Sequence, residues 1–143
     1  MSKIEKVLLT GKTHTTQVNP GDVHSKVNLN LSGTGAKAYA FEAVAAHPTA
    51  EQLFAGAWSA CYIGAVSIYA ASIGVQLPAD TAVDIEVDLG QTGDEYFLQA
   101  RQTLVVPGLP LDVATEIAHG ADKICPYSKA TLGNIDIALN VIV

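Results

Sequence analysis

Five stretches of the chain have the hydrophobic pattern of β-strands. Residues 3–14 predict a first strand that ends near Gly11. In the other four stretches hydrophobic and polar residues alternate, which is typical of strands with one buried face. They are residues 27–31, 83–89, 96–105 and 134–143.

Turn sequences join these strands into two predicted hairpins. Asn19–Asp22 (NPGD) separates the first two strands, and Gly90–Asp94 separates the next two. Residues 33–48 have no clear pattern and are interpreted as a loop near a site, with a short strand around Tyr39–Val44. In the strand 83–89, alternate positions divide between the core and water. Val83, Ile85, Val87 and Leu89 are expected to face the core, and Asp84, Glu86 and Asp88 to face water.

The longest apolar stretch, Leu53–Leu77, contains no charged residue and no histidine, and it predicts a long helix. Thr49 is placed to cap this helix, Gln52 completes a capping box, and Gly74 is expected to end it. The stretch exceeds the length of about 20 residues that spans a bilayer. However, it is only mildly hydrophobic and its flanks carry acids instead of basic anchors, so we interpret it as a helix buried on nearly all sides and expect no membrane association.

A second helix is predicted from Pro110, in its first turn, to Cys125, where Pro126 stops it. The order is therefore hairpin, helix, hairpin, helix, strand. Short links favour antiparallel pairing of the strands. These elements indicate an α+β fold in a single domain that covers residues 1–143.

Composition narrows the possible functions. Hydrophobic residues make up 49% of the 143 positions, which is more apolar material than a monomer of this size needs and indicates an oligomeric surface. The net charge is −6 and Arg101 is the sole arginine, so we expect no nucleic-acid partner. The first residues, MSKIEKVLL, do not resemble a signal peptide, and two cysteines without such a signal indicate a reducing compartment.

Cys61, inside the long apolar helix, and Cys125, after the second helix, are the candidate reactive groups. Taken alone, cysteines in an apolar chain are most often inert core residues. A zinc site is less favoured, because the chain has no CxxC and its four histidines show no ligand spacing. Neither a GxSxG motif nor a phosphate-binding glycine loop is present.

Longer motifs surround both cysteines and change this interpretation. Residues 51–65, EQLFAGAWSACYIGA, closely resemble the EQLFAAGYxACFxGA motif of the Ohr (organic hydroperoxide resistance) branch of the OsmC/Ohr family. Residues 125–136, CPYSKATLGNID, resemble its second motif, CPYSxATxGNID, and VPGL at 106–109 also fits. The resemblance covers most of the chain from residue 48 onward and is weak before residue 30.

This resemblance implies an OsmC/Ohr-like fold, with antiparallel sheets around a long buried central helix in an intertwined homodimer. It implies a cytoplasmic thiol peroxidase that reduces organic hydroperoxides, with Cys61 as the peroxidatic and Cys125 as the resolving cysteine. Cys61 would become a sulfenic acid and then form a disulfide with Cys125. The implied reductant is a dihydrolipoyl dithiol, often on a lipoylated protein; we expect no bound cofactor and no metal.

Apolar residues near Cys61 suit alkyl or lipid hydroperoxides as substrates. The candidates for an apolar route by which the substrate reaches Cys61 are Leu53, Phe54, Trp58, Tyr62 and Ile63. Core packing is the more common role of each such residue.

A peroxidatic thiol must ionise, and burial in an apolar helix opposes ionisation. The family supplies an arginine from the N-terminal hairpin region, held by the glutamate that Glu51 matches. This chain has no arginine there. Glu51 precedes Cys61 by ten residues, about 15 Å along a straight helix, so the two cannot touch directly.

Arg101, in the middle of a strand, is interpreted as a solvated side chain. The residues considered as substitutes for the missing arginine are Lys12, His14, His24 and Lys37. The missing arginine motivates an alternative hypothesis, a stress-associated binding protein of the same fold with weak or no peroxidase activity. A third hypothesis is that the two thiols are an inert structural pair.

Overall fold

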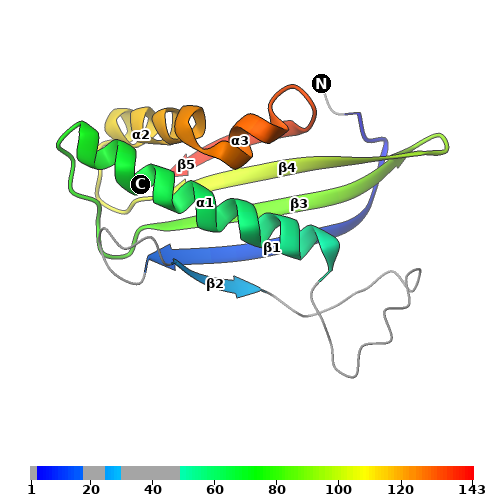
Figure 1. Cartoon of the computed structure of the whole chain (residues 1–143), viewed down its shortest axis with the longest axis horizontal. Coiled ribbons are helices and arrows are strands. Elements are labelled where there is room, and N and C mark those ends of the chain that lie inside the picture. The colour runs from blue at the N-terminus through cyan, green and yellow to red at the C-terminus, as the bar shows by residue number, and fades with distance from the viewer. Residues whose placement is uncertain (1–2, 18–24, 30–48) are drawn as a thin grey trace.

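The computed structural model describes residues 3–17, 25–29 and 49–143, which form five strands and three helices. The elements in chain order are β1 (Lys6–Gln17), β2 (Ser25–Leu29), α1 (Ala50–Ser72), β3 (Ala82–Thr92), β4 (Glu95–Val105), α2 (Leu111–Ile124), α3 (Pro126–Thr131) and β5 (Asp136–Ile142). Helix α1 lies across one face of the sheet, with α2 and α3 beside it (Figure 1). This is the α+β class expected from the sequence.

The strands form one sheet in the order β2-β1-β3-β4-β5. Neighbouring strands are antiparallel except for β5, which runs parallel to β4. The prediction of antiparallel pairing is therefore wrong for the last strand, and the expected antiparallel sheets are replaced by one mixed sheet in the described chain. The physical reason is that α2 and α3 form a crossover, and a crossover is the connection that parallel strands require.

Strand β1 continues to Gln17, beyond the end predicted near Gly11. It continues because Gly11 lets the strand pass close to the first turn of α1. A Cβ atom at Gly11 would lie 2.5 Å from the backbone nitrogen of Gln52, closer than real side chains approach. The predicted pairing of the first two strands is confirmed, with Thr13 opposite Leu29. The proposed turn Asn19–Asp22 and the short strand Tyr39–Val44 lie outside the described residues.

The capping box of α1 is confirmed. The Gln52 backbone N–H donates to Thr49 Oγ1 at 3.2 Å, and the Thr49 backbone N–H donates to Gln52 Oε1 at 2.9 Å. The helix ends at Ser72, and Gly74 follows with φ +73°, a left-handed conformation that glycine adopts without strain. The pattern of caps thus sets both ends of the helix that carries Cys61.

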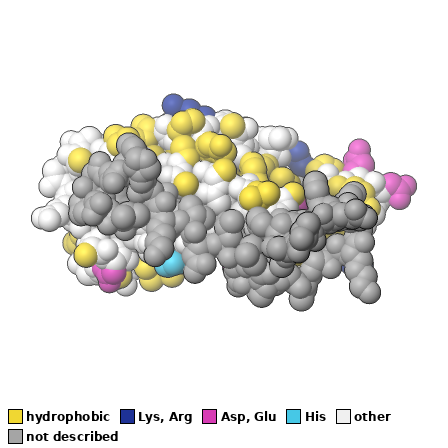
Figure 2. All heavy atoms as spheres, turned by 60° about the horizontal axis from the view of Figure 1, so that its bottom comes forward, with side chains coloured by type: hydrophobic (Ala, Val, Ile, Leu, Met, Phe, Trp, Pro, Cys, Tyr) yellow, Lys and Arg dark blue, Asp and Glu magenta, His cyan; other side chains and the backbone are white. Residues whose placement is uncertain are grey.

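The side of α1 that faces the sheet and α2 is buried, whereas the opposite side is not. Trp58 and Tyr62 are fully buried, but Leu53 and Ile68 keep 54% and 66% of their surface. The expectation of burial on nearly all sides is therefore wrong for this single chain. Figure 2 shows hydrophobic side chains gathered on one face of the molecule. By length and composition alone α1 would suffice to cross a membrane, and half of its most apolar window is buried inside the protein.

Helix α2 matches the predicted position, although Pro110 caps the helix instead of lying in its first turn. Gly120 allows α2 to pack tightly on α1, since a Cβ atom there would lie 2.2 Å from the ring of Tyr69. Pro126 ends α2 as predicted and also begins α3, a short helix that the pattern did not indicate. Proline suits both roles because it cannot continue a helix but fits the first helical position.

The sheet face turned away from α1 carries a network of charged and polar side chains. Asp88 belongs to it and is only 1% exposed, so the expectation that it faces water is wrong. Arg101 donates from its two terminal nitrogens to the Asp88 carboxylate at 2.6 and 3.0 Å, and from Nε to Glu86 at 2.7 Å. Thr10 and Gln99 also donate to Asp88. Arg101 is therefore an anchored, half-buried side chain instead of a solvated one.

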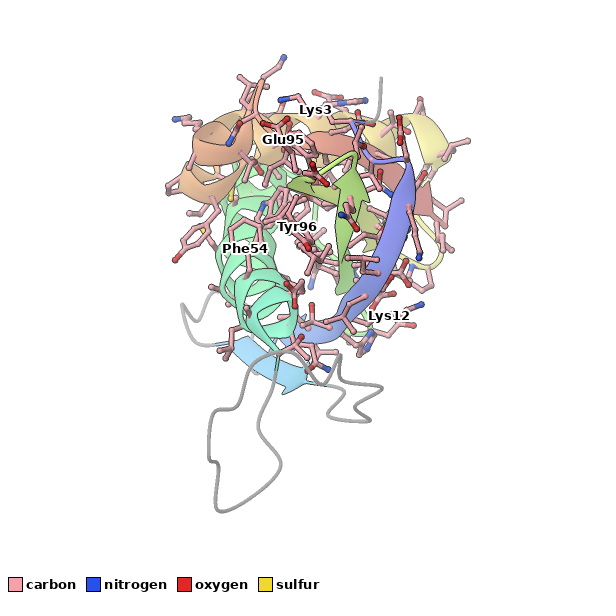
Figure 3. The ribbon with its side chains drawn as sticks, turned by 90° about the vertical axis from the view of Figure 1, so that its right-hand side faces the viewer. Lys3, Lys12, Phe54, Glu95 and Tyr96 are labelled. Atoms are coloured by element: carbon pink, nitrogen blue, oxygen red, sulfur yellow. The ribbon has the colours of Figure 1, made fainter. Side chains whose placement is uncertain are left out.

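The same contacts keep Asp88 ionised. Burial alone would favour the neutral acid, but the hydrogen bonds from Arg101, Thr10 and Gln99 outweigh it and lower the pKa of Asp88 to about 2. Lys12, opposite Glu86 in the next strand, bonds that carboxylate at 2.5 Å. Lys12 lies on the side of β1 that faces away from α1 (Figure 3).

We expect Arg101→Met to lower the free energy of unfolding by about 2–3 kcal/mol, because it leaves the buried Asp88 carboxylate without its charged partner. Lys12→Met is the matched control: it also removes a cation from this face, but Lys12 is 58% exposed and should contribute less than about 1 kcal/mol. Urea unfolding at pH 7 measures both variants. Equal losses in the two would show that Asp88 does not depend on Arg101.

Candidate functional site

The structure brings Cys61 and Cys125 together. Their Sγ atoms are 3.5 Å apart, and both are free thiols. Cys61 lies in the body of α1, and Cys125 is the residue between α2 and α3, where it caps both helices. A disulfide has an S–S distance of about 2.05 Å, so a shift of about 1.5 Å would let the two sulfurs bond.

Two buried hydrogen bonds attach α1 to the helices on either side of Cys125. The indole Nε1 of Trp58 donates to Ser128 Oγ in α3 at 3.2 Å. The hydroxyl of Tyr62 donates to the backbone oxygen of Ala118 in α2 at 2.8 Å. Burial raises the pKa of the Tyr62 hydroxyl, so it remains a neutral donor. Together these bonds locate Cys61 against the α2–α3 junction.

The two thiols differ in access. Cys125 is fully buried, whereas Cys61 is partly exposed. Burial raises the pKa of the Cys61 thiol, and a hydrogen bond from the backbone N–H of Tyr127 opposes this effect. The neighbouring Cys125 also raises it. The described surroundings of Cys61 therefore favour the protonated thiol.

The residues expected to form an apolar access route to Cys61 fall into two groups. Trp58, Tyr62 and Ile63 are buried core residues. Leu53 is more than half exposed near the start of α1, and Phe54 packs edge-on against Trp58 with ring centroids 5.8 Å apart. Core packing thus accounts for three of the five residues, and the other two lie nearer the surface.

Glu51 is not brought to the thiols. It is half-buried in the first turn of α1, beside Gly11 of β1, and α1 continues without interruption from there to Cys61. The spacing of ten residues corresponds to about 15 Å along the helix, as expected from the sequence. A further group would have to connect Glu51 with Cys61.

Two of the four substitutes considered for the family arginine are excluded by their position. Lys12 and His14 lie on the sheet face away from α1, paired with Glu86 and Asp84 at 2.5 Å each. Arg101 lies on that same face. His24 and Lys37 lie outside the described residues. No described cation among these candidates therefore reaches the helix side of the sheet.

Metal binding finds no support in the part of the chain that the structure describes, where no three His, Cys, Asp or Glu residues are arranged to hold an ion. The sequence alone also does not identify Ser128 and the Tyr127 backbone as contacts of the site. Both lie inside the second motif, which is the available signal. However, no pattern shows that the serine hydroxyl meets Trp58 or that the Tyr127 N–H points to Cys61.

Comparisons with known proteins show the family to which the chain is similar. The profile of the family described as OsmC-like protein matches residues 42–140. An organic hydroperoxide resistance protein of Xanthomonas axonopodis pv. citri is 36% identical over 91 residues. That match covers 64% of this chain and 64% of the relative, so the chain spans a little under two thirds of the relative's length.

Solved structures of two organic hydroperoxide resistance proteins share the fold. The organic hydroperoxide resistance protein OhrB of Bacillus subtilis superposes with a TM-score of 0.61 at 30% identity, covering 66% of this chain and 70% of that one. An organic hydroperoxide resistance protein from Legionella pneumophila gives a TM-score of 0.64 at 27% identity, covering 96% and 100%.

The short distance between the sulfurs predicts how the reduced protein responds to a general thiol oxidant. We expect diamide to convert it to a form with an intramolecular Cys61–Cys125 disulfide, because little movement is needed. Peptide mapping by mass spectrometry under non-reducing conditions detects the linked peptides. Cys125→Ser should yield no such link; linkage between separate chains in place of this one would contradict the geometry.

Proposed function

Because the chain belongs to the Ohr branch of the OsmC/Ohr family and holds two free thiols 3.5 Å apart, we propose that it is a thiol-dependent peroxidase that reduces organic hydroperoxides to alcohols. The adjacent thiols are the observation that carries this proposal. The names of the relatives support it, since they refer to organic hydroperoxide resistance. The resulting enzyme is an organic hydroperoxide reductase that acts in the response to oxidative stress.

The reaction proceeds in two steps on the protein. The Cys61 thiolate attacks the distal peroxide oxygen, the O–O bond breaks, and the alkoxide takes a proton to leave as the alcohol. Cys61 is then a sulfenic acid. The Cys125 sulfur attacks the Cys61 sulfur, the S–O bond breaks, and the hydroxide leaves as water with the thiol proton. The peroxide is reduced by two electrons, and the two thiols are oxidised to a disulfide.

Burial supports this division of roles. Cys61 is partly exposed and can meet a peroxide, whereas Cys125 is fully buried and meets only what lies within the protein. The apolar residues around α1 favour alkyl or lipid chains over small polar peroxides. An external dithiol such as a dihydrolipoyl group, free or on a lipoylated protein, then attacks the disulfide and restores both thiols.

We further propose that the active form is a cytoplasmic homodimer. The exposed apolar side of α1, with Leu53 and Ile68, supports association with a second copy. The reducing compartment follows from the need to regenerate two thiols after each turnover.

Purified protein with dihydrolipoamide should consume cumene hydroperoxide, and Cys61→Ser should reduce the rate to that of the reductant alone. Cys125→Ser should react once and then stop, since its sulfenic acid has no partner thiol. Coupled reduction of lipoamide by dihydrolipoamide dehydrogenase measures turnover. Full activity of Cys61→Ser would refute the proposal.

A binding protein with weak or no peroxidase activity is the second candidate. The raised pKa of Cys61 is the observation that favours it, because a protonated thiol is a poor nucleophile. Comparison of thiol reactivity with peroxide consumption separates the two functions.

We expect alkylation of Cys61 by iodoacetamide to rise about tenfold per pH unit near neutral pH, with its midpoint above that of an ordinary free cysteine thiol, since burial raises the pKa of Cys61. The peroxidase rate should rise in parallel, because both reactions use the thiolate. Peptide mass spectrometry quantifies the alkylation. Alkylation that rises while no peroxide is consumed at any pH would support the binding protein. A flat alkylation rate would show that a cation from elsewhere ionises Cys61.

A further inference from the structure

A buried hydrogen bond between two side chains connects the two short segments that carry the thiols. Trp58 lies three residues before Cys61, and Ser128 lies three residues after Cys125. The bond from Trp58 Nε1 to Ser128 Oγ is 3.2 Å long, and the two side chains are 0% and 4% exposed. Residues three apart lie on the same face of a helix, so Trp58 and Cys61 face α3 together.

The position of α3 depends on contacts such as the hydrogen bond between Trp58 and Ser128. It has six residues, begins with a proline and ends just before Gly133, which has a left-handed backbone. A helix of this length is unstable in isolation, and its place in the fold comes from tertiary contacts. Its contacts with α1 include the Trp58–Ser128 bond and the Tyr127 N–H that meets Cys61.

We propose that Trp58 and Ser128 are positioning residues that hold the Cys125 segment against Cys61, and so direct the Cys61 sulfenic acid to the disulfide. This inference rests on the proposed peroxidase function. It adds the pair of residues that keeps the Cys125 segment beside the oxidised Cys61.

The competing fate is overoxidation. A second hydroperoxide oxidises the Cys61 sulfenic acid to a sulfinic acid: one peroxide oxygen is transferred to sulfur and the alcohol leaves. This reaction depends on peroxide concentration, whereas condensation with Cys125 occurs within one molecule and depends on how often the two sulfurs meet. Loosening α3 lowers the rate of condensation with Cys125 and leaves the rate of overoxidation unchanged.

The test uses Trp58→Phe, Ser128→Ala and the double variant, treated in reduced form with increasing cumene hydroperoxide. Mass spectrometry quantifies the disulfide and the sulfinic acid at Cys61. We expect half-conversion to the sulfinic acid at about three- to tenfold lower peroxide in each single variant, as for the loss of one hydrogen bond. The double variant should be no more sensitive than the single variants, since both remove the same contact.

Ser59→Ala is the matched control. Ser59 follows Trp58 in the same turn of α1 and is fully buried, but its hydroxyl bonds Thr15 and Thr13 of β1 instead of α3. It should leave the ratio of sulfinic acid to disulfide as in the parent protein. The rate at which the Cys61 thiol is first consumed should be the same in Ser59→Ala as in the parent protein, and in the other variants it is measured so that the two products are compared at equal extents of first oxidation. The inference would be overturned if Ser59→Ala lowered the peroxide concentration for half-conversion to the sulfinic acid as much as the other single variants do. It would also be overturned if the effects of the two single changes added in the double variant.

A second readout needs no peroxide. In dithiothreitol redox buffers, a three- to tenfold loss in the tendency of the thiols to pair raises the midpoint potential of the Cys61–Cys125 couple by about 15–30 mV. Unchanged potentials in Trp58→Phe and Ser128→Ala would overturn the positioning role. If the parent protein forms the disulfide in these buffers but does not react with hydroperoxide, the proposed function fails and the positioning role is judged on the potentials alone.

Discussion

The packing of α1 against both the sheet and α2 is the constraint on which the rest of the structure depends. Both contacts are made at glycines: Gly11 lets β1 approach the first turn of α1, and Gly120 receives the ring of Tyr69. A methyl group at either position would displace the helix. Since Cys61 is carried by α1 and Cys125 is at the end of α2, this packing also determines how closely the thiols approach.

The sequence predicted the elements whose signals are local. Thr49 and Gln52 indicated the start of α1, and the alternation on either side of Gly93 indicated the β3–β4 hairpin. Pairing of β5 was predicted wrongly because strand direction depends on a crossover of two helices, which no local pattern specifies. Helix α3 was missed because Pro126 both ends one helix and begins another.

Burial of Asp88 was missed for a similar reason. A period of two places Asp88 on the same face as Asp84 and Glu86, which are half-exposed, and correctly assigns that face. What covers Asp88 is Arg101, a residue from another strand.

For the site, the residues alone favoured inert thiols, and the motif resemblance singled out Cys61 and Cys125 as partners. The structure then supplied their distance and the contacts with α3.

The charged side chains and the two thiols lie on opposite faces of the sheet. The basic side chains of Lys12, His14 and Arg101 are all paired with acids on one face, and the thiols lie on the other. A cross-sheet ion network of this kind stabilises the sheet under α1 and changes the electrostatic field at Cys61 little, because the charges of Lys12 and Arg101 are neutralised by Glu86 and Asp88.

The positions of the cysteines have a consequence for the chain as a whole. They are separated by 64 residues, and the segment between them contains β3, β4 and α2, which is the greater part of the folded core. A bond between the sulfurs closes this segment into a ring and removes many of its unfolded conformations, which in the chain-entropy account stabilises the folded state by about 4 kcal/mol. Each catalytic cycle would therefore alternate between a linear and a cyclised polypeptide, so that the resistance of the protein to heat and proteolysis reports its redox state.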